Sequence, residues 1–319
     1  MTWFPTLTDI EIAANRIAVW AHRTPVMKSS AIDAIAGCRL FFKCENFQKV
    51  GAFKFRGACN TVLSLSDSEA AHGVATHSSG NHAQALALAA SLRGIPAHIV
   101  MPSNAPAIKK AAVAGYGARI VFCDPTLEAR ETTLDAVVRE TGAVFVHPYN
   151  DVRVITGQAT AARELIQDVP DLDILMTPVG GGGLLSGSAL SAHYLSPRLK
   201  VVGSEPEGAD DAMRSFHAGY IIPSENPRTI ADGLLTSLGD KTFAIIQQHV
   251  REIVTVPDTA IVRAMRLIWE RMNIIIEPSA AVPLAAILEG RVNSSRKRIG
   301  IILSGGNLDL EHLPWMGNK

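Results

Sequence analysis

The sequence lacks the features that mark membrane, secreted and nucleic-acid-binding proteins. No apolar run approaches the ~20 residues that are needed to span a bilayer. Asp9 and Glu11 come early, and no basic segment followed by an apolar one precedes them, so no secretory signal is expected. Lys plus Arg equals Asp plus Glu, 30 against 30, which leaves no basic surplus to neutralise a phosphate backbone. We therefore expect neither a membrane nor a nucleic acid as partner.

Cysteine is also scarce. Cys38, Cys44, Cys59 and Cys123 form no CxxC pair and have no His-rich partner cluster, which argues against a zinc site. Four cysteines in 319 residues do not make a disulfide framework. Free, mostly buried thiols in a reducing compartment are the simplest interpretation, and it predicts a cytoplasmic protein.

Apolar residues are plentiful, at 47%, and they fall in short runs that alternate with helix-like segments. A length of 319 residues suggests two domains or one large domain. The strand-like runs are 39–44, 97–101, 119–123, 173–179, 200–204 and 298–304, and the helix-like segments are 81–93, 105–114, 126–141, 155–168, 184–195 and 258–272. This alternation predicts an α/β fold with mainly parallel sheets and right-handed crossovers.

A glycine run, GGGGL at 180–184, follows one strand-like run and opens a helix-like segment. In α/β folds, ligands bind at the carboxyl ends of strands, where such loops meet helix N-termini. Glycines let backbone N–H groups approach an anion, so the run predicts a phosphate cradle; the alternative is a flexible turn without a ligand. No Gly-Lys-Ser/Thr follows, and the dinucleotide fingerprint is not matched, which disfavours a P-loop and an NAD-dependent dehydrogenase.

Two further segments carry reactive or anion-binding groups. Lys54 lies between Phe53 and Phe55, and desolvation there would lower its pKa and free the amine for Schiff-base chemistry. Taken alone, a snorkelling lysine at a strand edge is the simpler interpretation. The segment SSGNH at 78–82 precedes a helix-like segment. It suits a carboxylate at a helix N-terminus, or ordinary N-capping by a serine or the asparagine.

Seven segments together resemble one family. They are KCENFQKVGAFKFRGA, THSSGNHAQALALAA, PVGGGGLLSG, GSEPEGADD, IADGL, EPSAA and LSGGN, in the family's order over roughly residues 5–310. They closely resemble the serine/threonine dehydratases and serine racemases, which are pyridoxal-phosphate (PLP) enzymes, and the 3-hydroxyaspartate dehydratases among them. The resemblance implies PLP fold type II, the tryptophan-synthase-β-like fold. It further implies a large PLP-binding domain (1–68 plus 149–319), a small mobile domain (72–148) and a homodimer.

The resemblance also implies roles for the cofactor-binding residues. Lys54 matches the lysine that holds PLP covalently, Phe53 the aromatic beside it, and Asn81 the asparagine that hydrogen-bonds the pyridoxal 3′-oxygen. Ser304 matches the serine that faces the pyridine nitrogen. A serine cannot hold that nitrogen protonated as an aspartate would, which suits elimination better than reactions that need a long-lived carbanion. The phosphate loop corresponds to Gly180, Gly181, Gly182, Gly183 and Leu184.

Substrate residues follow in the same way. Ser79 matches the second acid/base of serine racemases, across the cofactor from Lys54; many threonine dehydratases have alanine there. Arg130 and Ser237 match racemase positions near the substrate's side-chain end, and an arginine suits bidentate carboxylate binding. A surface helix arginine is the alternative for Arg130. The loop that receives the α-carboxylate corresponds to Ser78, Ser79, Gly80, Asn81 and His82.

An acidic segment, SEPEGADD, follows another strand-like run. Alone it would be taken as a solvated acidic turn. Two carboxylates and a backbone carbonyl, from Glu205, Asp211 and Ala209, can also hold a hard divalent ion. Because their spacing is similar to the metal site of metal-activated serine racemases, the resemblance predicts Mg²⁺, or Mn²⁺ or Ca²⁺, at this place.

The expected function is a PLP-dependent ammonia-lyase that eliminates the hydroxyl and amine of a β-hydroxy amino acid. We favour 3-hydroxyaspartate, giving oxaloacetate and ammonia, because serine and threonine would leave a desolvated Arg130 without an anionic partner. The alternatives are a serine/threonine dehydratase or a serine racemase. A β-replacement synthase is less favoured. From another class, a non-catalytic ligand-binding module could have kept the fold.

Overall fold

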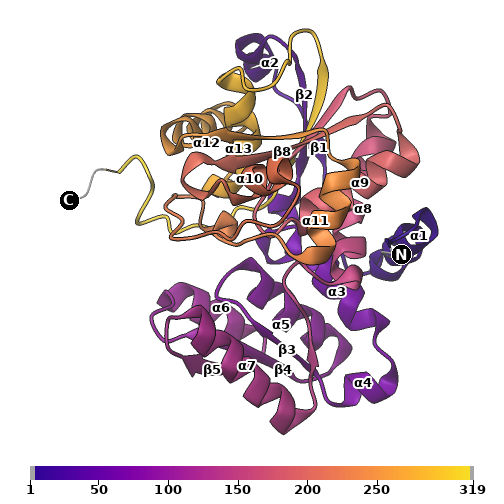
Figure 1. The fold of residues 1–319 in the computed structure, drawn as a ribbon, viewed down its shortest axis with the longest axis vertical. Helices are drawn as coiled ribbons and strands as arrows, with labels where there is room; N and C mark the ends of the chain where they lie inside the picture. Colours follow the sequence, from indigo (N-terminus) through magenta and orange to yellow (C-terminus); the bar gives the residue numbers. More distant parts are fainter. Residues whose placement is uncertain (1–3, 317–319) are drawn as a thin grey trace.

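Two β-sheets organise the chain, and each joins strands that lie far apart in the sequence (Figure 1). The computed structural model describes residues 4–316. One sheet has six strands in the order β1-β2-β10-β7-β8-β9, all parallel except β1, and the other has four parallel strands in the order β5-β4-β3-β6. The strands are β1 (Val26–Met27), β2 (Arg39–Cys44), β3 (Val74–His77), β4 (Ala97–Pro102), β5 (Arg119–Cys123), β6 (Val144–Phe145), β7 (Ile174–Pro178), β8 (Lys200–Pro206), β9 (Glu252–Val256) and β10 (Arg298–Leu303).

Helices cover both faces of the six-stranded sheet, which explains why its strands are apolar on both sides. Leu40 and Phe42 of β2 join one core with α12 and α13, whereas Phe41 between them joins a second core with α8 and α9. The helices are α1 (Leu7–Ile17), α2 (Ser30–Ala36), α3 (Lys54–Ser64), α4 (Asp67–Ala71), α5 (Asn81–Arg93), α6 (Ala107–Gly115), α7 (Leu127–Thr141), α8 (Val152–Asp168), α9 (Gly183–Leu195), α10 (Asp211–Ala218), α11 (Asp240–His249), α12 (Asp258–Met272) and α13 (Pro278–Leu288), with short 3₁₀ turns η1 (Glu45–Phe47), η2 (Lys49–Gly51), η3 (Glu207–Ala209) and η4 (Asp232–Leu234).

The predicted α/β class is confirmed, and every predicted strand is present with its ends shifted by at most two residues. The pattern missed β1 and β6, which have two residues each, and β3, whose four residues include Thr76 and His77. Such strands are too short to show a period. It missed the edge strand β9 as well, whose five residues include the polar Glu252 and Thr255. Among the helices it missed α1, α2, α4, α10, α11 and α13. It also missed α3: Lys54 begins a helix and does not lie at a strand edge. No side chain caps this helix, so the usual N-terminal signal is absent from the sequence.

Helix α3 lies between the two sheets and packs on both sides. We call the four-stranded sheet with α5, α6 and α7 the small lobe, and the six-stranded sheet with its helices the large lobe (Figure 1). Phe55 and Val62 of α3 share a core with Leu86 of α5 in the small lobe. On its other side α3 meets α8 of the large lobe so closely that a Cβ on Gly157 would lie 2.6 Å from the Arg56 carbonyl oxygen. The predicted domain division at 68–72 and 148–149 stays a prediction.

A buried charge network fixes α3 against the large lobe. The Arg56 guanidinium donates to the Glu45 carboxylate from Nε at 2.7 Å and from Nη2 at 2.9 Å. It also donates to Glu164 of α8 from Nη1 at 2.7 Å and from Nη2 at 2.9 Å. Lys43 of β2 donates to the same Glu164 at 2.5 Å. Each charge therefore has a partner within the protein, as charges removed from water require.

The four cysteines are buried and unpaired, as expected. Among residues 4–316, no helix is both long enough and apolar enough to cross a membrane.

Replacing Arg56 by methionine should lower the free energy of unfolding by about 3–5 kcal/mol, because it leaves the buried Glu45 carboxylate without a cation and Glu164 with Lys43 alone. Arg266→Met is the matched control, since Arg266 pairs with Glu270 on an exposed face of α12, and its loss should cost no more than about 0.5 kcal/mol. Urea denaturation of both variants measures the difference. Equal, small losses would show that the network does not stabilise the fold.

Candidate active site

Lys54 and Ser304 lie side by side at the carboxyl ends of the large-lobe strands. The Phe53 N–H donates to the Ser304 carbonyl at 3.0 Å, and Ser304 directly follows β10. An isolated bridge between Ala52 and Gly305 continues this pairing. The loop after β10 therefore places Ser304 next to the first turn of α3, where the parallel sheet collects its loops.

The Lys54 side chain is half-buried. Its Nζ donates to the Pro148 carbonyl at 2.9 Å and lies 5.3 Å from the centre of the Phe53 ring. Exclusion of water lowers the pKa of Lys54 to about 8, although the nearby Glu277 carboxylate opposes this shift. An amine with such a pKa is partly unprotonated near neutral pH, so it can act as a nucleophile or a base.

A buried carboxylate and two amides join the lobes beside Lys54. Asn81 of α5 donates from Nδ2 to the Glu277 oxygens at 3.2 and 3.1 Å. Its own Oδ1 accepts from Asn307 Nδ2 at 2.9 Å. Burial raises the pKa of Glu277 to about 7. Asn81 thus reaches from the small lobe to the loop that contains Ser304. At the edge of the lobes, Lys109 of α6 pairs with Asp232 at 2.7 Å.

The glycine run forms a tight turn with free amides. Among residues 4–316, no acceptor is recorded for the N–H groups of Gly180, Gly181 and Gly182. A Cβ on Gly181 would lie 2.3 Å from the Tyr149 ring, and Gly182 has a φ of 86°. Free amides at the N-terminus of α9 suit a phosphate group. The alternative, a flexible turn without a ligand, does not fit, because the neighbouring side chains leave these glycines no space to move.

The residues present fit PLP on observations of this structure. The Ser304 side chain is 2% exposed, and its Oγ has no hydrogen-bond partner among the described residues. A buried hydroxyl without a partner points to an acceptor or donor supplied by another molecule. PLP has a ring nitrogen, a phosphate and an aldehyde carbon. The Ser304 hydroxyl would hold the ring nitrogen, the amides of the glycine run the phosphate, and the Lys54 amine the aldehyde carbon.

The segment 78–82 joins β3 to the first turn of α5. Gly80 is the N-cap of α5 and no side chain caps this helix, so neither Ser79 nor Asn81 has the capping role that was one alternative. No hydrogen bond of the Ser79 side chain is recorded among residues 4–316. His82 Nε2 lies 3.2 Å from the Val146 carbonyl oxygen, while its buried Nδ1 has no partner in the described part.

Arg130 and Ser237 occupy different surroundings. Arg130 lies in the first turn of α7, near His77 at the end of β3. Burial makes the largest contribution to the lowered pKa of His77, and the charge of Arg130 lowers it further. The Nε of Arg130 is buried without a partner, and within residues 4–316 it pairs with neither Glu128 nor Glu131. The Ser237 hydroxyl accepts from the Ser224 amide at 2.8 Å. The two side chains share no recorded hydrogen bond.

The acidic segment brings two carboxylates together at the end of β8. Glu205 and Asp211 are each 1% exposed. Glu205 accepts from the Ala212 and Met213 amides at 3.1 and 2.8 Å, whereas neither Asp211 oxygen has a partner at hydrogen-bonding geometry in residues 4–316. Burial raises the pKa of Asp211 to about 6, and the nearby Ser224 hydroxyl partly opposes this. Ala209 is buried in η3 beside them. The pair is therefore not a solvated turn.

Three side chains of the site escaped the sequence reasoning. They are Glu277, which stands in the segment EPSAA, and His147 and Tyr149, which stand between the predicted strands and helices. Their roles depend on contacts with distant residues, for which the sequence offers only the Pro148 and Asn150 turn signals around Tyr149. No group of three or more His, Cys, Asp or Glu side chains that could hold a metal occurs in the described residues.

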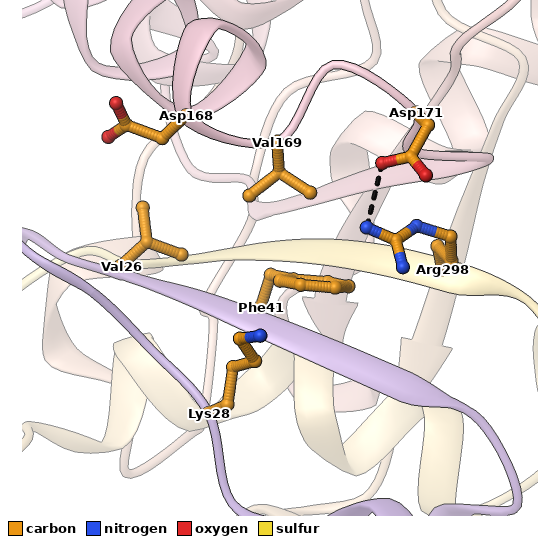
Figure 2. A pocket seen from close by; sticks show the side chains of 7 residues that line it. All are labelled: Val26, Lys28, Phe41, Asp168, Val169, Asp171 and Arg298. Carbon is orange, nitrogen blue, oxygen red and sulfur yellow. Dashed lines mark ion pairs between the residues drawn. The ribbon is translucent and has the colours of Figure 1, made fainter.

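The pocket in Figure 2 lies at the opposite edge of the sheet, beside the start of β10. Arg298 pairs there with Asp171 at 2.7 Å and covers the Phe41 ring. No predicted site residue lines it. The lining residues are Val26, Lys28, Phe41, Asp168, Val169, Asp171 and Arg298.

Comparison with known proteins gives consistent matches. A family model described as pyridoxal-phosphate dependent enzyme matches residues 17–305. The chain is similar to a β-hydroxyaspartate dehydratase of Paracoccus denitrificans, 52% identical over 98% of this chain and 99% of that protein. It is 48% identical to an L-threo-3-hydroxyaspartate ammonia-lyase of Saccharomyces cerevisiae, over 96% of this chain and 94% of that protein. The structure of maize serine racemase superposes with a TM-score of 0.95 at 49% identity, covering 97% of this chain and 95% of that one.

Gly181→Ala should weaken PLP binding and lower the melting temperature, because its Cβ would overlap the Tyr149 ring and overpacking costs about 1–3 kcal/mol. Gly115→Ala is the control, since a Cβ there meets open space. PLP titration and thermal unfolding of both variants measure the effect. Normal PLP affinity in Gly181→Ala would contradict a phosphate-binding role of the run.

Proposed function

Since the chain belongs to the family of pyridoxal-phosphate-dependent enzymes, with PLP fold type II as predicted, we propose that it is an ammonia-lyase for 3-hydroxyaspartate. The reaction removes the β-hydroxyl as water and the amine as ammonia, and water re-enters when the product hydrolyses to oxaloacetate. The names of two relatives, a β-hydroxyaspartate dehydratase and an L-threo-3-hydroxyaspartate ammonia-lyase, support this substrate.

The bound cofactor supplies an electron-withdrawing ring that stabilises negative charge at the substrate Cα. The amides of residues 180–184 would bind its phosphate, Asn81 its 3′-oxygen and the Ser304 hydroxyl its ring nitrogen. Phe53 lies beside Lys54, and its ring helps to exclude water from that amine. These roles are proposals that rest on the free amides, the unpartnered hydroxyl and the lowered pKa of the amine.

Lys54 and Ser79 are the proposed acid/base groups. Lys54 can exchange a proton near neutral pH because its pKa is about 8. Ser79 stands on the small-lobe side and makes no recorded contact within residues 4–316 that would occupy its hydroxyl. Ser78, Gly80 and His82 complete the proposed α-carboxylate loop with Asn81. An amine of lowered pKa is of little use to a mere ligand-binding module, which disfavours that alternative.

One observation carries the choice of substrate: the Arg130 guanidinium has a buried Nε without a partner among the described residues. A second carboxylate on the substrate would supply that partner, with Ser237 proposed as an added hydroxyl. A hydrogen bond to a charged group contributes about 1.5–3 kcal/mol, or one to two decades of selectivity.

Serine racemisation is the second candidate. Ser79 favours it, because removal of a proton from one face and its return to the other needs a group on each face. The match to maize serine racemase supports it independently. A serine/threonine dehydratase remains the third possibility within the same site.

We further propose a divalent cation, Mg²⁺ or else Mn²⁺ or Ca²⁺, held by Glu205, Asp211 and the Ala209 carbonyl. Two buried carboxylates, one of them without any hydrogen-bond partner in the described part, suit a hard cation that keeps several waters. A cytoplasmic homodimer is proposed on the family resemblance and, for the compartment, on the four free thiols.

The substrate assignment predicts that 3-hydroxyaspartate exceeds serine and threonine in kcat/KM for ammonia release. Arg130→Ala should lower kcat/KM for 3-hydroxyaspartate by about 10–100-fold and leave serine almost unchanged. Arg139→Ala on the exposed side of α7 is the matched control, and Lys54→Ala should lose the visible PLP band and all turnover. Chiral analysis of the remaining serine reports racemisation in the same assay. A wild type that handles serine or threonine at least as well would reject this substrate.

The cation proposal predicts that a chelator lowers the melting temperature and that Mg²⁺ or Mn²⁺ restores it, because a ligand that binds only the folded state stabilises it. Asp211→Asn should no longer respond to either treatment. A response that persists in this variant would place the cation elsewhere.

A further inference from the structure

A histidine-capped turn lies at the return from the small lobe to the large one. His147 Nδ1 accepts from the backbone N–H of Asn150 at 2.9 Å and of Tyr149 at 3.3 Å. The His147 ring also meets the Tyr149 ring edge to face, with centroids 4.6 Å apart. One nitrogen therefore satisfies two amides that would otherwise face the interior, and it closes residues 147–150 into a tight turn.

The turn controls three parts of the site. The Pro148 carbonyl accepts from Lys54 Nζ at 2.9 Å. The Tyr149 ring fills the space beside Gly181 in the glycine run. Asn150 accepts from the Lys241 amide at 3.0 Å and donates to Asp240 at 2.7 Å, which ties the turn to the start of α11. An opening of the turn would displace the acceptor of the Lys54 amine.

We propose that His147 is a positioning residue: its neutral imidazole, acting as an acceptor through Nδ1, holds the turn that aims the Pro148 carbonyl at Lys54. The proposal rests on the proposed role of Lys54 in the reaction. An uncharged amine has two N–H groups and one lone pair. A fixed acceptor for one N–H limits its rotation and directs the lone pair away from Pro148.

The surroundings keep His147 neutral, as an acceptor must be. Burial lowers its pKa to about 4, with further contributions from His77, Lys54 and Lys241, and Asp151 opposes them. At neutral pH the proton of the ring is therefore on Nε2, and Nδ1 is free to accept. Protonation at both nitrogens would remove the acceptor and open the turn.

The test separates the acceptor from the ring. His147→Asn keeps an acceptor one bond beyond Cγ, close to the position of Nδ1, and loses the ring, whereas His147→Phe keeps the ring and loses the acceptor. His147→Gln moves the polar group one atom further out and replaces His147→Phe if that variant does not fold. Thermal unfolding serves as the folding control. The readouts are the rate at which the full-length protein, freed of cofactor, forms its visible band with added PLP, and kcat and KM of the loaded enzyme.

We expect His147→Asn to form the band within about threefold of the wild-type rate, and His147→Phe or His147→Gln to be about tenfold slower or more, with the loss in kcat and not in KM. Equal losses in the Asn and Phe variants would overturn the proposal in favour of ring packing, and so would a wild-type rate in His147→Phe. If the wild type forms the band but releases no ammonia from any hydroxy amino acid, the proposed function fails while the comparison of band rates still decides the role of His147.

Discussion

The buried pairing of Arg56 with Glu45 and Glu164 is the contact on which the geometry of the site depends. Arg56 comes two residues after Lys54, so whatever fixes the guanidinium also fixes the first turn of α3. Charged groups that have lost water bind only partners placed at hydrogen-bonding distance. Apolar packing alone would tolerate a small shift of the helix; these bonds do not. The orientation of Lys54 is therefore set from the core of the large lobe.

Burial around Lys54 shifts several titratable groups toward their uncharged forms. It lowers the pKa of Lys54 to about 8 and of His147 to about 4, and it raises the pKa of Glu277 to about 7. Near neutral pH His147 is therefore neutral, Glu277 is about half protonated and Lys54 is partly unprotonated. The amides of the glycine run attract a phosphate through dipoles that do not change over this pH range.

The sequence predicted the parts of the fold that local pattern controls. The strands β2, β4, β5, β7, β8 and β10 are largely apolar runs of five to seven residues. The glycine run stands between β7 and α9, as a phosphate loop should. Helix α3 was missed because its flanking aromatics are typical of a strand and no side chain caps its start. The family resemblance, and not the pattern, selected Lys54.

Contacts between distant segments could not be derived in this way. The acceptor role of His147 depends on a turn whose amides fold back onto the ring, and the pairing of Asn81 with Glu277 joins residues almost two hundred positions apart. The buried Nε of Arg130 was equally invisible, because its neighbours Glu128 and Glu131 suggested surface ion pairs that the structure does not contain among the described residues. Such features arise from tertiary packing, which periodicity does not encode.

The contact between α3 and α8 has a mechanical consequence. At Gly157 the two helices touch backbone to backbone, since a Cβ would lie 2.6 Å from both the Arg56 carbonyl oxygen and the Gly57 Cα. On its opposite side α3 meets α5 through side chains such as Phe55 and Leu86. Side-chain contacts can slide, whereas a backbone contact at this distance cannot. If the lobes separate, the movement therefore occurs at the contact between α3 and α5. Lys54 then stays with the large lobe, and the SSGNH segment moves with the small lobe toward and away from it.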